Sequence, residues 1–126
     1  MSDEDGLVPA DVSADVPADI PADVARLVRD CIDRLETLHV LLLLHATESR
    51  TWTIRDVSLE RRSSLYGTEM SLGVLVEHGL VAREDDVYWF SARTPELASR
   101  TAALADCYRT HPTAVIALIF SGGAKP

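Results

Sequence analysis

The sequence has few of the residues that cross-link small proteins or bind metal ions. Its 126 residues include only two cysteines, Cys31 and Cys107, which lie far apart and show no CxxC spacing. Both sit in segments with helical patterning, so neither a disulfide framework nor a zinc site is expected. We therefore expect two buried free thiols, because free cysteine is among the most buried residue types.

Long hydrophobic runs are also missing. No apolar stretch approaches the ~18 residues that a membrane-spanning helix needs. The first residues, MSDEDG, are acidic, whereas a signal peptide begins with basic residues and continues into an apolar stretch. The sequence therefore predicts a soluble, cytoplasmic protein with no membrane partner.

Basic residues are missing from the N-terminal segment. Residues 1–23 contain seven Asp or Glu and no Lys or Arg, whereas residues 24–126 contain 13 acids and 12 bases. Seven of the eight net negative charges therefore belong to the N-terminal segment, and the rest of the chain is nearly neutral. A neutral body neither supports nor excludes DNA binding, since local clusters of Lys and Arg determine phosphate affinity.

No arrangement of residues that is typical of catalysis or cofactor binding occurs. His39 and His45 are six residues apart, about 600° of helical rotation, so they do not form a metal-binding pair on one face. Ser63 and Ser64 lack a spaced base and acid, and Gly67 and Gly73 do not form a phosphate-binding loop. We expect no catalytic residues, no cofactor and no enzymatic activity.

The N-terminal segment instead contains a short repeat. Residues 9–24 comprise four copies of [Pro/Ser]-Ala-Asp-[Val/Ile], and three of them begin with proline. Proline removes backbone donors and prevents a continuous helix. Residues 1–20 are therefore predicted to form an extended, mobile acidic tail.

Hydrophobic periodicity predicts several helices after this tail. Residues 22–33 have one apolar stripe, whereas residues 35–44 are apolar around most of a helix and either continue the first helix or follow a bend near Arg34. Residues 54–62 fit a short helix, and residues 63–78 fit a longer one that ends at Gly79.

The second half of the chain adds a hairpin and further helical segments. Two β-rich runs, residues 80–83 and 87–90, flank the polar residues 84–86, as in a hairpin. Thr94-Pro95-Glu96 is typical of a helix start, and His111-Pro112 of its end. Residues 114–120 are wholly apolar, so periodicity does not distinguish strand from helix; we favour a short helix. The fold class is mainly α, with α+β character.

The motifs LETLHVLLLLHA, TWTIRDVS, SSLYGTEMSLGVLVEHGLVAR and VYWF together resemble a winged-helix domain of the MarR and ArsR type. The resemblance covers roughly residues 34–90, and its most specific phrase is LVEHGLVAR at residues 75–83. It implies three helices followed by a two-stranded wing in a domain of residues 21–93. Residues 94–121 would then form a helical extension, and residues 122–126 a flexible tail.

The resemblance also implies a transcriptional regulator that binds duplex DNA through residues 63–78. The candidate DNA-binding residues are Arg55, Arg61, Arg62, Ser63, Ser64, Tyr66, Thr68, Ser71 and Arg83. Three carboxylates, Glu84-Asp85-Asp86, occupy the predicted wing tip and would be repelled by phosphate, so the wing itself is not expected to contact DNA.

Two further interpretations remain open. A winged helix also serves as a protein-interaction or scaffolding module without DNA binding, and the acidic wing and near-neutral body favour that alternative.

A homodimer is expected in the regulator. Its candidate interface residues are Val24, Leu27, Val28, Val115, Ile116, Ile119 and Phe120. The aromatic residues near the hairpin are expected to cover the core, with a ligand pocket as the alternative.

Overall fold

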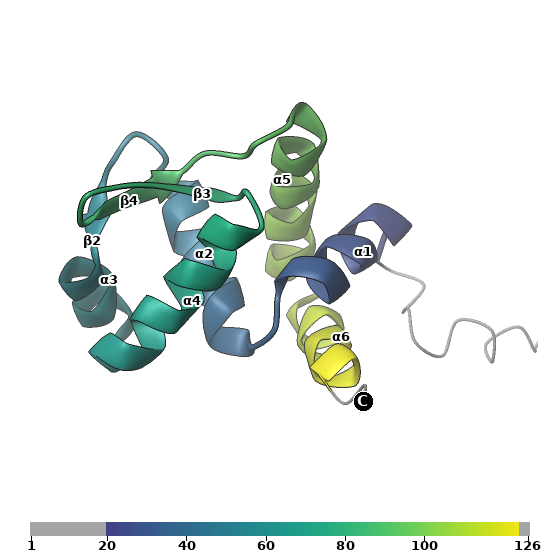
Figure 1. The fold of residues 1–126 in the computed structure, drawn as a ribbon. Coiled ribbons are helices and arrows are strands. Elements are labelled where there is room, and N and C mark those ends of the chain that lie inside the picture. Colours follow the sequence, from purple (N-terminus) through teal and green to yellow (C-terminus); the bar gives the residue numbers. More distant parts are fainter. Residues whose placement is uncertain (1–19, 124–126) are drawn as a thin grey trace, which may run out of the picture.

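The computed structural model describes residues 20–123, which form six helices and three short strands. In chain order these are α1 (Ala22–Cys31), α2 (Leu35–Ala46), β2 (Trp52–Thr53), α3 (Ile54–Arg61), α4 (Leu65–Glu77), β3 (Val81–Glu84), β4 (Val87–Phe90), α5 (Pro95–Thr110) and α6 (Pro112–Gly123). The sheet and α3 lie at one end of the molecule, α1, α5 and α6 lie at the other, and α2 and α4 lie between them (Figure 1). The predicted mainly helical fold class is confirmed at this level.

The first two helices are separate. The chain leaves α1 in an extended conformation at Ile32 and enters α2 from an extended Arg34, so the bend allowed by the sequence is present. Amphipathic α1 buries its apolar stripe, whereas α2 is apolar around most of its circumference and runs through the centre of the core. Within residues 20–123, four helices therefore precede the hairpin, one more than the resemblance implied.

The predicted hairpin is present and belongs to a larger sheet. Strands β3 and β4 pair antiparallel, with Val81 opposite Phe90 and Glu84 opposite Val87. Strand β2 pairs antiparallel with the other edge of β4, which gives the strand order β2-β4-β3. The sheet therefore has three strands instead of the two expected. Trp52 of β2 pairs with Tyr88 of β4, and both side chains are buried.

Local capping explains how α3 and α4 are placed. Thr53 and Asp56 form a capping box at the start of α3, and the left-handed Arg62 ends that helix. Ser64 then caps α4 by accepting a hydrogen bond from the backbone nitrogen of Gly67. These caps fix the short turn between the two helices.

The predicted stop at Gly79 is confirmed. Gly79 has a φ of 77°, and its nitrogen donates to Val76 O while the nitrogen of Leu80 donates to Leu75 O. This bond pair is a Schellman motif, in which glycine avoids the steric penalty of a left-handed residue. The motif turns the chain directly from α4 into β3.

The C-terminal helices fold back onto α1. As predicted, Thr94 caps α5 by accepting a bond from the nitrogen of Leu97, and Pro95 occupies the first turn. The apolar run after His111 is helical and belongs to α6, which packs against α1 and α5. No helix among residues 20–123 is long and apolar enough to cross a bilayer.

This packing corrects the predicted dimer interface. The residues Val24, Leu27, Val28, Val115 and Ile119 are all buried in the core of their own chain, and Ile116 is partly buried. Only Phe120, with 63% of its surface exposed, points outward among the seven candidates. The apolar faces of α1 and α6 cover each other, so they are not available to a second subunit.

Two predicted boundaries also change. Ile20 is 3% exposed and belongs to the core, so the predicted tail of residues 1–20 extends one residue too far. Residues 1–19, the rest of that tail, lie outside the described residues. At the other end α6 reaches Gly123, two residues beyond the predicted end of the helical extension.

Candidate interaction surface

Helix α4 divides sharply into a buried and an outward face. The side chains of Thr68, Ser71, Leu72 and Leu75 are fully buried. The outward residues are Leu65, Tyr66, Glu69, Met70, Gly73 and Glu77. At ~100° per residue these six positions span an arc of about 140°, with Gly73 near its centre.

The outward face of α4 is unusually apolar for a solvent-facing helix. Leu65, Tyr66 and Met70 are 53%, 72% and 45% exposed, and Leu59 at the end of α3 is 69% exposed. These four are the exposed large hydrophobic residues in the described part of the chain, apart from Phe120. We call Leu59, Leu65, Tyr66 and Met70 the α4 patch. Of these four, Tyr66 and Met70 line one groove, and exposed apolar side chains that lie together usually mark a binding surface.

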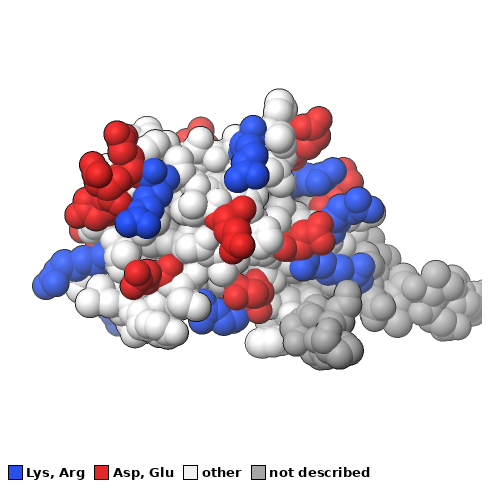
Figure 2. Space-filling view, in the orientation of Figure 1, with Lys and Arg blue, Asp and Glu red and all other residues white. Residues whose placement is uncertain are grey.

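The charged side chains of α4 itself are negative, whereas exposed Arg62 lies between α3 and α4. Helix α4 contains no Lys or Arg, and its outward face contributes Glu69 and Glu77. The carboxylates of residues 84–86 are exposed at the hairpin turn. On the face shown in Figure 2, acidic residues gather at the end where the hairpin turns, and the described residues form no continuous basic area along α4.

A groove runs between this helix face and the hairpin. Its volume is about 480 Å³, and its lining combines the outward side of α4 with residues of β3 and β4. The lining residues are Tyr66, Glu69, Met70, Gly73, Val74, Glu77, Arg83 and Tyr88. Arg83 is the one basic residue of this lining; its Nε donates to the backbone oxygen of Asp85, and its guanidinium lies 5.6 Å from the Tyr88 ring centre.

The buried face of α4 is held to α2 by hydroxyl groups. Ser71 Oγ accepts a hydrogen bond from Arg34 Nη2 and lies 3.2 Å from Thr37 Oγ1. Thr37 Oγ1 in turn donates to Asp33 Oδ1 at 2.7 Å. Thr68, the other buried hydroxyl of α4, lies 3.2 Å from Ser63 Oγ, which donates to Glu36 Oε2. These hydroxyls therefore satisfy one another inside the protein.

His39 connects α2 to both α3 and α5. Its Nδ1 lies 2.7 Å from Arg61 Nη2, and its Nε2 lies 3.0 Å from the Tyr108 hydroxyl. Because arginine only donates, Nδ1 is the acceptor, and the ring proton sits on Nε2 and is donated to Tyr108. Desolvation by burial, and secondly the charge of Arg61, hold the pKa of His39 below its ordinary value, while Glu36 opposes this shift.

The structure separates the candidate DNA-binding residues into three groups, which are exposed, fully buried and partly buried. Arg55, Arg62, Ser64, Tyr66 and Arg83 are exposed. Thr68 and Ser71 are fully buried, so their predicted place on the outward face is corrected; they pair with hydroxyls instead. Ser63 and Arg61 are partly buried and bind Glu36 and His39 within the chain.

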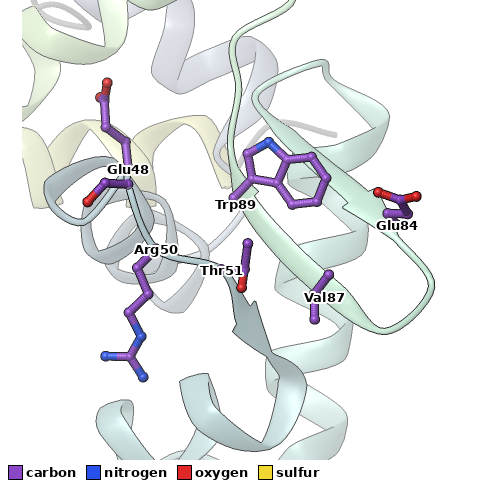
Figure 3. Close-up of a pocket in the computed structure, with 7 residues that line it drawn as sticks. Glu48, Arg50, Thr51, Glu84, Val87 and Trp89 are labelled. Atoms are coloured by element: carbon purple, nitrogen blue, oxygen red, sulfur yellow. The ribbon is translucent and has the colours of Figure 1, made fainter.

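Of the hairpin aromatics, for which a ligand pocket was the alternative to core packing, only Trp89 lines a second, smaller hollow. Trp52 and Tyr88 are buried, and Trp89 lines an open hollow of about 310 Å³ with residues of the α2–β2 loop (Figure 3). Arg50 also lines it but points away from Trp89, and its guanidinium lies 3.6 Å from the Trp52 ring centre. The hollow opens widely to solvent, and its lining mixes Glu48 and Glu84 with one indole.

The two cysteines are free and differ in burial. Cys31 is buried and Cys107 is half-buried, so the expectation of full burial fails for Cys107. Burial, and secondly a neighbouring carboxylate, raises the pKa of both thiols. Both thiols therefore stay protonated and poorly nucleophilic near neutral pH. No group of three His, Cys, Asp or Glu side chains within residues 20–123 is arranged to hold a metal ion.

In comparisons with known proteins, no protein-family model, no curated protein and no solved structure matches this chain.

Proposed function

We propose that this chain is a winged-helix protein-interaction module, which binds a protein partner through the outward face of α4. The single observation that carries the proposal is the composition of that face. It presents exposed Leu65, Tyr66 and Met70 beside Glu69 and Glu77, and it carries no cation. The β3–β4 hairpin after α4 and its pairing with β2 support the winged-helix assignment.

A helix with this face is poorly suited to the major groove of DNA. Affinity for duplex DNA comes largely from Lys and Arg that neutralise phosphates. On α4 the charged outward side chains are carboxylates. Among the predicted cations, Arg61 is hydrogen-bonded to His39, and Arg83, which lines the groove beside α4, donates to Asp85 O. Arg55 and Arg62 are exposed on the α3 side, which leaves few cations for phosphate contact. The proposal therefore departs from the expected DNA-binding regulator.

The same face is well suited to a protein partner. Tyrosine and methionine are enriched in the cores of protein interfaces, where large side chains fill pockets and exclude water. The α4 patch lies next to a groove that can accept such side chains from a partner. Substituting its exposed residues should reduce binding without unfolding the protein, because those side chains contribute little to the core.

Capture from extracts of the source cells tests the proposal. The immobilised full chain is compared with the double variant Tyr66→Ser, Met70→Ser and with the control Phe120→Ser, which removes an equally exposed hydrophobic away from α4. We expect a protein partner to be retained by the wild type and by Phe120→Ser, and lost by the double variant.

A parallel titration with fluorescent duplex DNA of pooled sequence completes the test. We expect no saturable binding at low salt, where phosphate contacts are strongest. Saturable binding that Arg55→Ala and Arg62→Ala abolish would overturn the proposal in favour of the DNA-binding regulator. Equal capture by wild type and the double variant would overturn the assignment of the interface to α4.

A further inference from the structure

Gly73 stands in the middle of α4 although nothing inside the protein requires it. A Cβ added to Gly73 would meet no atom within 4 Å, whereas one added to Gly79 would lie 2.9 Å from Arg93 Nε. Gly73 is also in an ordinary helical conformation, since Gly79 is the one glycine of residues 20–123 with a positive φ. Glycine destabilises a helix interior relative to alanine, so Gly73 weakens α4 without any internal packing gain.

The position of Gly73 indicates where its role lies. Gly73 is near the centre of the outward arc and lines the groove, with Tyr66 and Met70 on one side along the helix and Glu77 on the other. A residue without a side chain there lowers the floor of the groove. A glycine at such a point allows another backbone to approach the helix closely.

We propose that the groove receives an amphipathic basic α-helix of the partner protein, with its closest approach at Gly73. This inference rests on the proposed function and names the partner's chemistry. The apolar face of the partner helix packs against Tyr66 and Met70, and its Lys or Arg side chains reach Glu69 and Glu77. The stretch from Tyr66 to Glu77 is about 16 Å long at 1.5 Å per residue, which matches about three turns of a helix.

Charge complementarity selects this occupant over two others. The groove is lined by Glu69 and Glu77, and Arg83 is already hydrogen-bonded to the hairpin backbone. A second copy packed face to face would bring the same carboxylates against each other. The N-terminal residues 1–23 carry seven acids and no base, so they too would meet like charge. A basic helix meets opposite charge at Glu69 and Glu77, which outnumber the single cation of the lining, Arg83.

Selection from a displayed peptide library tests the inference without knowledge of the natural partner. The library presents amphipathic peptides. One face of each is fixed as small apolar residues, and the polar positions are randomised among Lys, Arg, Gln, Asp and Glu. A parallel library carries a central proline that breaks the helix. Selection on the full chain should enrich Lys and Arg in the helical library and nothing in the proline library.

Two variants locate the bound peptides. Gly73→Leu fills the floor of the groove and should weaken binding at least about tenfold, while Ala102→Leu, at an exposed position of α5, should leave binding unchanged. A thermal melt of Gly73→Leu verifies its folding, and Gly73→Ala, which adds a single methyl group, should weaken binding by a smaller factor. Glu69→Gln with Glu77→Gln should reduce both the affinity and its salt dependence.

Several outcomes would overturn the inference. These are enrichment of acidic peptides, equal enrichment of proline-broken peptides, no enrichment, or selected peptides that bind Gly73→Leu as tightly as wild type. Self-association of the chain that Gly73→Leu abolishes would assign the groove to a second copy instead. If one of these outcomes occurs while partner capture from extracts still requires Tyr66 and Met70, only the basic-helix inference fails. If capture does not require Tyr66 and Met70, the proposed function fails as well.

Discussion

The imidazole of His39 accepts a hydrogen bond from Arg61 through Nδ1, at 2.7 Å, and thereby joins the central helix α2 to the end of α3. The same ring reaches Tyr108 on α5 through Nε2. A neutral histidine therefore joins α3, at one end of the molecule, to α5, at the other (Figure 1). Protonation would place a second donor against Arg61 and break this arrangement.

We expect this histidine to make stability depend on pH. The pKa of His39 is lowered in the folded protein, chiefly by burial and then by Arg61, so protons bind more readily to the unfolded chain. The stabilisation is fully present above the unfolded-state pKa of about 6.5, and it is lost as the pH falls through the lower folded-state pKa.

Urea unfolding between about pH 5 and pH 8 measures this effect. The variant His39→Gln keeps an acceptor for Arg61 and a donor for Tyr108 but does not titrate. Its free energy of unfolding should therefore fall less than that of the wild type on acidification. Parallel curves for the two proteins would show that His39 does not contribute to the pH dependence.

A second prediction concerns Ser71, which the sequence placed among the DNA contacts. Ser71→Ala should lower the free energy of unfolding by about 1–2 kcal/mol, because it removes a buried partner of Arg34 and Thr37. Chemical denaturation measures the change, with Ser99→Ala on the exposed side of α5 as the control. A neutral result for Ser71→Ala would contradict the buried hydroxyl arrangement.

Substitution by alanine should have opposite effects on the free energy of unfolding at Gly73, inside α4, and at Gly79, just after it. Gly73→Ala should raise the free energy of unfolding by about 0.5–1 kcal/mol, because alanine favours helix and its methyl group meets open space. Gly79→Ala should lower it by more than this amount, because Gly79 has a φ of 77° and its Cβ would lie 2.9 Å from Arg93 Nε. Thermal melts of both variants distinguish the signs; destabilisation by Gly73→Ala would imply an internal role for that glycine.

The leucines of α4 offer a test of which face is buried. Leu72→Ala should cost about 2–5 kcal/mol by opening a cavity in the core, since Leu72 is 0% exposed. Leu65→Ala should change stability by no more than about 0.5 kcal/mol, because Leu65 is 53% exposed. Similar losses for the two variants would mean that α4 is rotated relative to the orientation described here.

Local signals in the sequence were sufficient to predict most elements of the fold. The apolar stripe of residues 22–33, Gly79 as a helix stop and Thr94-Pro95 as a helix start are each contained within one segment of chain, and all three are present. The third strand was harder to predict. Trp52 and Thr53 are a two-residue strand, and only their pairing with Tyr88 and Val87, far away in the sequence, makes them part of the sheet.

The candidate site was predicted less well, for a physical reason. Thr68 and Ser71 were grouped with Tyr66 because hydroxyls are polar, yet on a helix Thr68 lies about 200° away from Tyr66. A helical projection of residues 65–77 would have separated the two faces. It would not have revealed that Arg34, which precedes α2, and Thr37, in its first turn, satisfy Ser71.

The predicted interface failed for a related reason. The periodic apolar residues in 24–28 and 115–120 predict correctly that each segment buries one face. Periodicity does not say whether the cover is another subunit or another helix of the same chain. Here α1 and α6 cover each other, so the pattern contains no signal for a dimer.

Site-specific photo-crosslinking in the source cells tests the central claim most directly. A photoreactive amino acid replaces Tyr66, whose side chain is 72% exposed at the edge of the groove, and adducts are analysed after irradiation. We predict a covalent adduct with a protein, formed through a segment that is rich in Lys or Arg and helical in pattern, and no nucleic-acid adduct. A nucleic-acid adduct at this position, or the absence of any adduct, would contradict the claim that the outward face of α4 binds a protein.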